Sequence, residues 1–228
     1  MPKALRQLTT GLCSLCGTAV SGDHIEHGLC DSCREELRTS PGPFSIAPTQ
    51  EIHDSDTPEP WVMCAHEYAG LTLRLIERMK LAGDTRLAAV AASTLLRPIL
   101  ETVSLEPSAA TRSSVLVPIP ASRDGRRRRG FDQSLLLAKA LERTGIAAVQ
   151  PVLHRRGGSD QKHLDRADRF SNIVNQLELR PGASLSAEVS VVLVDDVVTT
   201  GASMLAARSL LVEAGAQRCV GIALAFRT

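Results

Sequence analysis

Residues 191–203 have the sequence VVLVDDVVTTGAS, and this stretch decides the fold. Its first four residues are apolar and predict a buried strand, after which two carboxylates stand side by side. Small residues then lead into a helix predicted over Met204–Ala214, and Cys219–Ala225 predicts the next strand. Because this is a strand–helix–strand unit, we expect its first loop to lie at the carboxyl edge of a parallel sheet, where α/β proteins bind ligands.

The residue types in this stretch fit a ligand that carries a phosphate and two neighbouring sugar hydroxyls. Asp195 and Asp196 can accept hydrogen bonds from the two hydroxyls. The N–H groups at a helix N-terminus bind phosphate, and a glycine lets the backbone come close to it. The phosphate-binding set is therefore expected to be Thr199, Thr200, Gly201, Ala202 and Ser203. The alternative is an ordinary strand-to-helix turn capped by Ser or Thr, but such a turn does not need two carboxylates.

At every position the stretch resembles the motif with which type I phosphoribosyltransferases bind 5-phosphoribosyl 1-pyrophosphate (PRPP). In that family the acidic pair holds the ribose 2′ and 3′ hydroxyls, and the loop holds the 5′-phosphate. The resemblance implies that Asp195 and Asp196 are the catalytic carboxylates and that the ligand is PRPP, bound with Mg²⁺. It also implies a reaction in which pyrophosphate is displaced from C1 of PRPP, onto an acceptor that the sequence does not identify.

The composition of the 228 residues, with 43% hydrophobic and 22% charged residues, is that of a soluble globular protein. The aromatic content of 3% argues against an extensive base-stacking surface, and the formal net charge of +1 leaves nucleic-acid binding to a local patch. No apolar run reaches transmembrane length, and residues 1–10 lack the apolar core of a signal peptide. We therefore expect a cytoplasmic protein without membrane insertion.

Four of the six cysteines form two knuckles of similar sequence, GLCSLC at 11–16 and GLCDSC at 28–33. Two such pairs can supply four thiolates to one tetrahedral Zn²⁺. The predicted ligands are Cys13, Cys16, Cys30 and Cys33. Residues 1–40 are therefore predicted to be a zinc module, stabilised by the metal because so short a segment cannot bury a core. The alternatives are disulfides or redox-active thiols, and His24 or His27 could replace one cysteine.

A proline-rich segment separates the cysteines from the rest of the chain. Residues 41–60 contain five prolines and few apolar residues, and they are predicted to be a linker. A main domain over 61–228 follows. In it a helix is predicted to begin after Gly70, and a second helix over Thr85–Leu100 is expected to kink or end at Pro98.

A further strand is predicted over Val115–Pro120, and arginines are concentrated in the residues that follow it. The small-residue turn after this strand, with Ser122 and Arg123, suits a second phosphate site. Four arginines follow at 126–129, and they could be a solvated face, ligands for the phosphates of PRPP, or a nucleic-acid patch. On a helix such a run points in all directions, so at most two of its members can reach one site.

Residues 154–172 lack strong periodicity, which predicts a loop that is in part mobile. The polar residues of interest in it are Arg155, Arg156 and Gln161.

Together these motifs resemble the ComF family, in which a four-cysteine zinc module precedes a phosphoribosyltransferase domain. The transferase half is also similar to that of glutamine PRPP amidotransferase. Beyond the cysteine pairs and residues 191–203, the matching pieces are Tyr68-x-Gly70 with Lys80 and Gly83-Asp84, Val117-Pro118-Ile119-Pro120, Arg129-Gly130-Phe131-Asp132-Gln133, and Gln161 with Arg169 and Asn172. The family usually has Asn where this chain has Asp132.

The resemblance implies an α/β fold of the type I phosphoribosyltransferase kind, a twisted, mostly parallel sheet with helices on both faces, plus the small zinc module. Val117–Arg123 would be the pyrophosphate loop, in which Ser122 and Arg123 bind PRPP. Residues 154–172 would be the flexible loop that closes over PRPP and excludes water.

The family is associated with DNA uptake in natural transformation. The alternative function is therefore the binding of single-stranded DNA, together with other DNA-uptake proteins, with PRPP as a regulatory ligand only.

Overall fold

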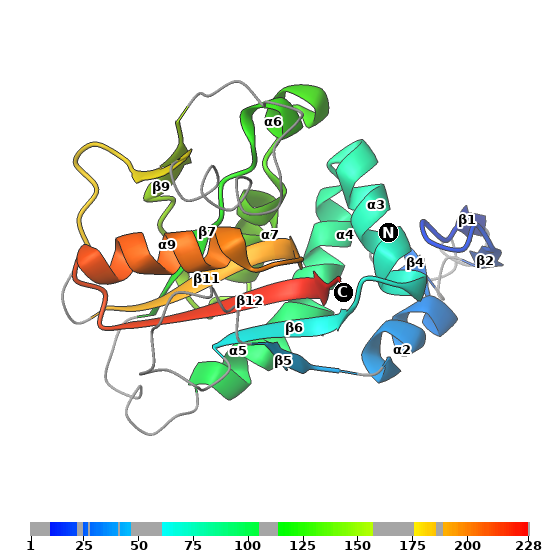
Figure 1. Cartoon of the computed structure of the whole chain (residues 1–228). Coiled ribbons are helices and arrows are strands. Elements are labelled where there is room, and N and C mark those ends of the chain that lie inside the picture. Colours follow the sequence, from blue (N-terminus) through cyan, green and yellow to red (C-terminus); the bar gives the residue numbers. More distant parts are fainter. Residues whose placement is uncertain are drawn as a thin grey trace.

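The computed structural model describes residues 10–21, 25–26, 28–40, 42–46, 61–104, 114–156, 176–185 and 189–227. A six-stranded sheet forms the centre of the molecule, and a small cysteine-rich part lies at one end of it (Figure 1). None of the helices in the described ranges combines the length and the apolar character needed to span a membrane.

The central sheet has the strand order β5-β6-β12-β11-β7-β8. Its strands are β5 (Phe44–Ile46), β6 (Val62–Glu67), β12 (Arg218–Phe226), β11 (Ser190–Val198), β7 (Ser114–Pro118) and β8 (Ala148–Val149). From β6 to β8 the neighbours pair in parallel, whereas the edge strand β5 pairs antiparallel with β6. The predicted mostly parallel sheet is confirmed.

β11 is a central strand because β7 and β12 pair with it on both sides along its apolar half. Val191 to Val194 are buried there, as their sequence predicted. The strand then continues through Asp195 and Asp196 to Val198, with β12 still paired to it beyond the end of β7. The acidic pair was predicted to follow the strand but is part of it, so its backbone is fixed by the sheet.

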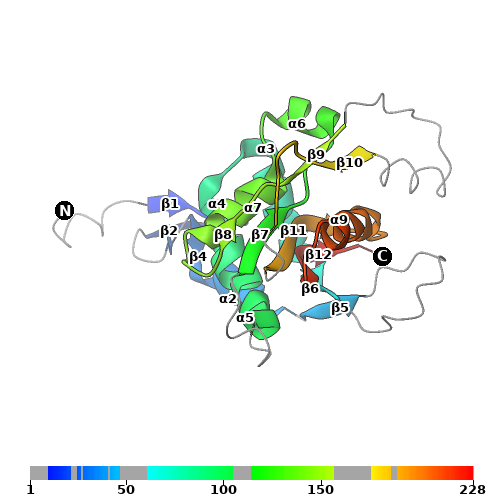
Figure 2. The same ribbon diagram turned by 90° about the vertical axis from the view of Figure 1, so that its left-hand side faces the viewer.

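Helices cover both faces of the sheet, as predicted (Figure 2). They are α9 (Ala202–Glu213) on one face, and α3 (Gly70–Ala82), α4 (Thr85–Val90) and α7 (Gln133–Glu142) on the other. The side chains of β11 alternate between two cores: Val191 and Leu193 pack on the α9 side, whereas Val192 and Val194 pack on the α7 side. The α/β class is therefore confirmed.

The helix predicted over Thr85–Leu100 does not end at Pro98. α4 passes into a π-helix, η2 (Ala91–Leu96), and α5 (Arg97–Ser104) continues from it. A proline inside a helix has no N–H to donate and its ring displaces a carbonyl of the preceding turn, so the wider π turn directly before Pro98 accommodates it. The proline thus changes the helix locally without terminating it.

The cysteine-rich part consists of two short hairpins and one helix. They are β1 (Thr10–Leu12) with β2 (Ala19–Ser21), β3 (Ile25–Glu26) with β4 (Leu29–Cys30), and α2 (Asp31–Thr39). Leu29 and Leu37 are fully buried, and they share one core with Leu75 and Met79 of α3. This part therefore packs against the main domain and completes its core on the α3 side.

Residues 44–46 lie in the predicted linker but form β5 and extend the sheet at its edge. Phe44 lies opposite Cys64 in the ladder. A Cβ atom at Gly42 would lie 1.8 Å from the carbonyl oxygen of Ala65, so only glycine can approach β6 this closely. A strand of three residues is too short for its alternation to be recognised among prolines.

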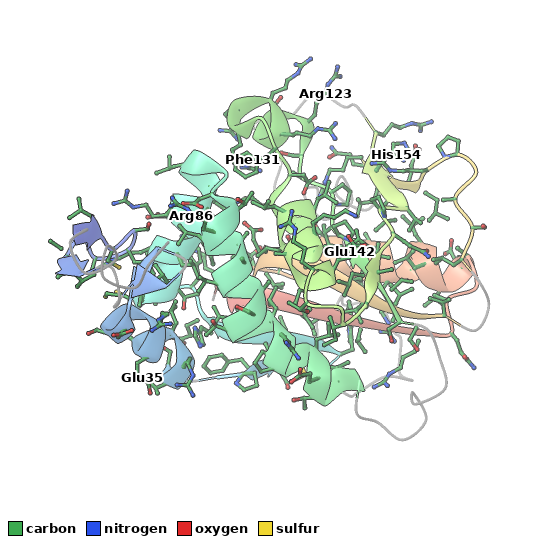
Figure 3. The ribbon with its side chains drawn as sticks, turned by 180° about the vertical axis from the view of Figure 1, so that it is seen from behind. Glu35, Arg86, Arg123, Phe131, Glu142 and His154 are labelled. Atoms are coloured by element: carbon green, nitrogen blue, oxygen red, sulfur yellow. The ribbon has the colours of Figure 1, made fainter. Side chains whose placement is uncertain are left out.

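A separate antiparallel pair, β9 (Leu153–Arg155) and β10 (Leu177–Leu179), stands beside the sheet, at the same end as α6 (Arg123–Arg129). Figure 3 labels Arg123 and His154 at this end. Arg155 therefore belongs to a strand rather than to the predicted loop. Arg156 directly follows it, and its N–H donates to the Gln176 carbonyl oxygen (2.7 Å).

Candidate functional site

The acidic pair of β11 is held by hydrogen bonds from two elements. Ser134 Oγ of α7 donates to Asp195 Oδ1 (2.8 Å), and the backbone N–H of Asp196 donates to the same oxygen (2.9 Å). Burial of Asp195, and next the adjacent charge of Asp196, raise the pKa of the Asp195 carboxyl well above its usual range. Two carboxylates kept together against this repulsion are typical of a functional site.

Lys80 of α3 provides the counter-charge for the acidic pair. Its Nζ lies 3.0 Å from Asp196 Oδ2 and 5.8 Å from the centroid of the Tyr68 ring. Arg227 lies over the same ring, at 5.7 Å. The Lys80 and Asp196 side chains are only 30% and 15% exposed, so water screens their attraction less than at an open surface. The ion pair therefore orients the Asp196 carboxylate.

The turn after β11 contains the residues predicted to bind phosphate. Gly201 is the N-cap of α9 and has φ +75°, a left-handed conformation that favours glycine. The Ala202 N–H donates to Thr200 Oγ1 (3.4 Å), Thr199 and Thr200 are exposed, and Ser203 is partly buried. The acidic pair and the first turn of α9 therefore lie at the two ends of one short turn.

Arg155 connects this turn to the loop after β7. Its Nε donates to the carbonyl oxygen of Pro120 (2.8 Å), and its Nη2 donates to Ser203 Oγ (3.0 Å). The guanidinium thus places a positive charge between the two loops that were predicted to bind phosphates.

The loop after β7 is shaped by two helix caps. Asp132 Oδ2 accepts the N–H of Ala121 (2.8 Å), and its Oδ1 accepts the N–H of Leu135 (3.3 Å) in the first turn of α7. Ser122 Oγ accepts the N–H of Gly125 (3.0 Å) as N-cap of α6, which leaves its hydroxyl proton for another acceptor. Asp132 suits this position because each of its two carboxylate oxygens accepts one N–H group, that of Ala121 or that of Leu135.

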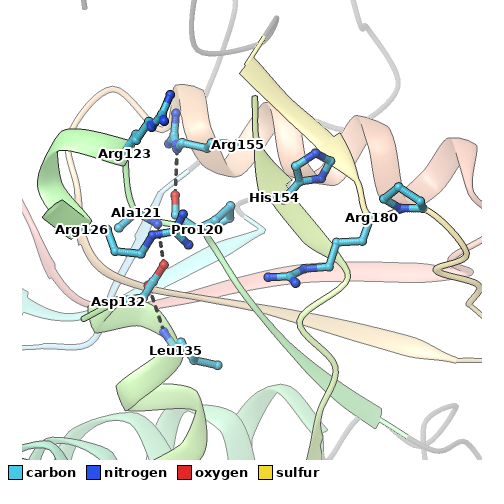
Figure 4. A pocket seen from close by; sticks show the side chains of 10 residues that line it. Pro120, Ala121, Arg123, Arg126, Asp132, Leu135, His154, Arg155 and Arg180 are labelled. Atoms are coloured by element: carbon cyan, nitrogen blue, oxygen red, sulfur yellow. Dashed lines mark hydrogen bonds between the residues drawn. The ribbon is translucent and has the colours of Figure 1, made fainter. Parts of the chain in front are cut away.

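A cavity of about 720 Å³ opens between this loop, α6 and the β9–β10 pair (Figure 4). Its lining residues are Pro120, Ala121, Arg123, Arg126, Asp132, Leu135, His154, Arg155, Arg180 and Pro181. We call it the arginine pocket. Neither the acidic pair nor residues 199–203 line it, and Arg155 is the lining residue that also contacts Ser203.

The arginines at 126–129 have different environments. Arg126 lines the arginine pocket, whereas Arg127 and Arg128 are exposed. The Arg129 guanidinium folds back over Gly125, where a Cβ atom would lie 2.6 Å from its Nη2. One member of the run therefore reaches the pocket, within the limit of two set by helical geometry.

Phe131 connects the arginine-rich segment to α3. A Cβ atom at Gly83 would lie 3.0 Å from the Phe131 ring, and Gly83 itself has φ +58°. Figure 3 places Phe131 between α6 and the α3–α4 turn. Glycine at this turn therefore allows the end of α3 to dock against Phe131, close to Lys80.

The four cysteines of the knuckles come together as predicted. Their Sγ atoms all lie within 4.8 Å of one another, and those of Cys16 and Cys30 lie 3.8 Å apart. A tetrahedral ion with bonds of about 2.3 Å to sulfur requires sulfur atoms about 3.8 Å apart. Hydrogen bonding with the side chain and backbone of Thr18 lowers the pKa of the Cys16 thiol to about 6, which favours a thiolate ligand. The cluster can therefore hold a metal ion, and all six cysteines are free of disulfides.

Several residues of this region were not predicted as site residues. Lys80 and Asp132 stood in the family motifs, which could have identified them, whereas Ser134 follows such a motif directly. His154 lies in β9 and Arg180 directly follows β10, and no pattern in the sequence connects them. The predicted loop residue Gln161, with Arg169, Asn172, His24 and His27, lies outside the described residues.

The raised pKa of Asp195 predicts a pH-dependent cost to stability. The Asp195 carboxyl binds its proton more tightly in the folded state than in the unfolded state, where its pKa is about 3.9. Stability should therefore fall as the pH rises from that value through the folded pKa, and Asp195→Asn should remove the fall. We expect the variant to melt at a higher temperature than the parent at pH 8, with the difference shrinking toward pH 4, in thermal unfolding followed by circular dichroism.

The control for this experiment is Glu213→Gln, which changes an exposed carboxylate at the end of α9. If the melting temperatures of the parent and of Asp195→Asn depended on pH in the same way, ionisation of Asp195 would not destabilise the folded protein.

The chain is similar in sequence to known proteins. Residues 148–228 match the family described as phosphoribosyl transferase domain. Over 218 residues the chain is 28% identical to the DNA utilization protein YhgH of Salmonella typhimurium (strain LT2), covering 90% of this chain and 92% of that protein. It is 25% identical over 215 residues to the competence protein ComFC of Bacillus subtilis (strain 168), covering 92% of this chain and 75% of that protein.

A solved structure, adenine phosphoribosyltransferase from Saccharomyces cerevisiae complexed with an imino-altritol bisphosphate and adenine, aligns with a TM-score of 0.39 and 16% identity. The alignment covers 86% of this chain and 89% of that one. Relatives at 25–28% identity along nine-tenths of its length, a phosphoribosyl transferase domain match and a four-cysteine cluster confirm the resemblance to the ComF family that the sequence motifs predicted.

Proposed function

We propose that this protein binds PRPP and transfers its phosphoribosyl group, with displacement of pyrophosphate. The observation that carries the proposal is the turn after β11, which has two carboxylates at one end and the N-terminus of α9 at the other. PRPP offers the matching groups in the same order, a ribose diol and a 5′-phosphate. The domain match over residues 148–228 includes this turn.

In this proposal the acidic pair accepts hydrogen bonds from the ribose 2′ and 3′ hydroxyls. Thr199, Thr200, Gly201, Ala202 and Ser203 hold the 5′-phosphate through their N–H and hydroxyl groups. Ser122 and Arg123 bind the diphosphate, and Arg155 lies between the two phosphate groups through its bonds to Pro120 and Ser203. Arg156 and Gln161 belong to the segment proposed to close over the ligand and exclude water.

Catalysis would follow from positioning and charge. Breaking the bond between C1 and the diphosphate leaves positive charge on the ribose ring, and the acidic pair beside the ring would stabilise that charge. Arg123 and Arg155 would stabilise the negative charge that develops on the leaving diphosphate. Mg²⁺, for which carboxylates and diphosphate oxygens are suitable ligands, would supply further charge neutralisation when bound. Lys80 would keep the Asp196 carboxylate oriented toward the ribose.

Substitution of either aspartate tests the ribose site. Asp195→Asn and Asp196→Asn should each weaken PRPP binding, because each removes a charged acceptor for a hydroxyl. Such bonds are worth about 1.5–3 kcal/mol, so affinity should fall by about one to two decades in calorimetry with Mg²⁺. Parent affinity should also rise with pH, because the raised pKa of Asp195 leaves less carboxylate at low pH.

The matched control is Asp124→Asn, an exposed carboxylate in the first turn of α6. Unchanged affinity in both acidic-pair variants would rule out the ribose site, whereas the same loss in Asp124→Asn would indicate a general charge effect.

The cysteine cluster is proposed to hold one structural Zn²⁺, whose preferred ligands are thiolates in a tetrahedral arrangement. The metal would fix β1–β4 and α2 and, through the shared core, support α3. Trp61, the single tryptophan, precedes β6 and lies under Arg208 at 4.8 Å, so its fluorescence reports on the main sheet.

Metal analysis should find about one zinc per chain in protein purified without added metal. Cys13→Ser should lose this zinc, and its unfolding transition should shift to lower temperature by both circular dichroism and Trp61 fluorescence. The shift in both signals is expected because the module and the sheet share a core. Cys64→Ser, which changes a buried cysteine outside the cluster, should retain the metal. Protein that is free of zinc yet has the same transition would contradict the assignment.

A second candidate function is the binding of single-stranded DNA. It is favoured by two exposed arginines of α6, Arg127 and Arg128, and by the names of the relatives, a competence protein and DNA utilization proteins. With a net charge of +1, such binding would depend on this local patch.

Fluorescence anisotropy with a labelled oligonucleotide at several salt concentrations tests this candidate. Replacing Arg127 and Arg128 together with Gln should reduce the magnitude of the slope of log affinity against log salt by up to about 1.4, since each phosphate contact that forms with single-stranded DNA releases about 0.7 counterions. Arg218→Gln, on a different part of the surface, should leave the slope unchanged. A double variant with the parent's slope would identify the two arginines as solvated side chains.

A further inference from the structure

We propose that the arginine pocket is a second anion site, which binds the phosphate monoester of another ligand while PRPP occupies the β11 turn. The inference rests on the proposed function only in assigning the neighbouring turn to PRPP. The ligand class, a phosphate monoester, follows from the charge, the shape and the lining of the pocket.

The first argument is position. The acidic pair and residues 199–203 do not line the pocket, so it does not coincide with the ribose and 5′-phosphate site. The Pro120–Ala121 segment lies in the pocket wall, and Asp132 holds it in place by accepting the Ala121 N–H. Arg155 contacts both sides, with Ser203 on one side and the pocket on the other. Two separate ligands can therefore share one guanidinium.

The second argument is charge. Among the described residues, four guanidiniums line the pocket against one carboxylate, that of Asp132, whose two oxygens already accept backbone N–H groups. Glu178 is engaged elsewhere, with Arg156 at 3.1 Å and His154 at 3.4 Å. Within the described ranges, no carboxylate forms an ion pair with Arg123, Arg126 or Arg180. Because the proposed function uses Arg123 and Arg155 for the diphosphate of PRPP, Arg126 and Arg180 remain to neutralise a second anion.

The third argument is geometry. Arg126 and Arg180 extend toward one another from opposite sides of the pocket (Figure 4). Arg180 Nε donates to the Leu153 carbonyl oxygen (3.3 Å), which directs the rest of its guanidinium into the pocket. Guanidiniums bind phosphate oxygens in pairs, and a monoester offers three terminal oxygens where a diester offers two. A phosphate monoester can therefore accept more hydrogen bonds from the two facing arginines than the diester phosphates inside a nucleic-acid strand can.

The fourth argument is the remaining space. A cavity of about 720 Å³ exceeds what a phosphate group fills, and it lies in the range of small-molecule sites. The lining that the described ranges contribute holds Pro120, Pro181 and Leu135, but no Phe, Tyr or Trp on which a base could stack. The pocket is thus suited to the phosphate and the adjoining sugar or alcohol, with recognition by charge rather than by a nucleobase.

Calorimetry with protein saturated with PRPP and Mg²⁺ tests the proposal, because PRPP then blocks the 5′-phosphate site. The probes are glycerol 3-phosphate and a dinucleotide with a 5′-phosphate, and the negative control is the same dinucleotide with a 5′-hydroxyl. We expect at least one phosphorylated probe to bind and the hydroxyl dinucleotide not to bind. Binding of glycerol 3-phosphate identifies a small ester as sufficient, whereas binding of the dinucleotide alone identifies a strand end.

Arg126→Gln and Arg180→Gln should each weaken binding of the probe by about tenfold or more, as loss of charge-assisted bonds requires. The matched control is Arg143→Gln, which changes an exposed arginine at the C-terminal end of α7 outside the pocket and should bind the probe as the parent does. The two pocket variants should retain their affinity for PRPP, which separates the pocket from the ribose site.

Three results would overturn the inference. Probe binding that PRPP abolishes would make the pocket the diphosphate end of the PRPP site, with the proposed function intact. A lack of binding by both phosphorylated probes, or pocket variants that bind them like the parent, would leave the arginines as solvated side chains. If PRPP itself failed to bind while the probes bound in the pocket, the proposed function would fail and the second site would stand.

Discussion

The parallel pairing of β11 with β7 and β12 is the constraint on which the rest of this structure depends. Backbone hydrogen bonds on both sides fix the apolar half of the strand, and β12 continues to hold it through the acidic pair. Asp195 and Asp196 therefore cannot relax away from each other, although burial and the adjacent Asp196 disfavour the charge of Asp195. Two contacts from the helices stabilise the acidic pair. Ser134 of α7 donates a hydrogen bond to Asp195, and Lys80 of α3 forms an ion pair with Asp196.

Opposite charges are arranged on the two sides of a single loop. Carboxylates lie at the end of β11, and arginines from α6, β9 and the segment after β10 lie beyond the Pro120–Ala121 segment. Arg155 contacts both the Pro120 carbonyl oxygen and the Ser203 hydroxyl, so one side chain connects the two loops. An arrangement of this kind suits a ligand, or a pair of ligands, in which hydroxyl groups and phosphates are separated by the length of a sugar.

The sequence predicted those parts of the molecule that depend on local pattern. Val191 to Val194 and the two knuckles carry strong signals, because burial of a parallel strand and tetrahedral metal coordination restrict residue type and spacing. β5 was missed because three residues carry no usable period. Of the two alternatives predicted for Pro98, a kink or a helix end, the helix end is wrong, because the helix continues past Pro98 after a π turn. The arginine pocket could not be predicted, since His154 and Arg180 meet only through the pairing of β9 with β10.

The burial of Leu29 and Leu37 against α3 has a consequence for how this chain can be divided. A shortened chain beginning at residue 61 would keep the phosphoribosyltransferase match but lose β5, and it would expose to water the side of α3 on which α2 packs. Exposed apolar surface of this kind promotes self-association. The cysteine-rich segment therefore completes the core of the domain that contains the central sheet, and we expect the two parts to be stable only when they are expressed together.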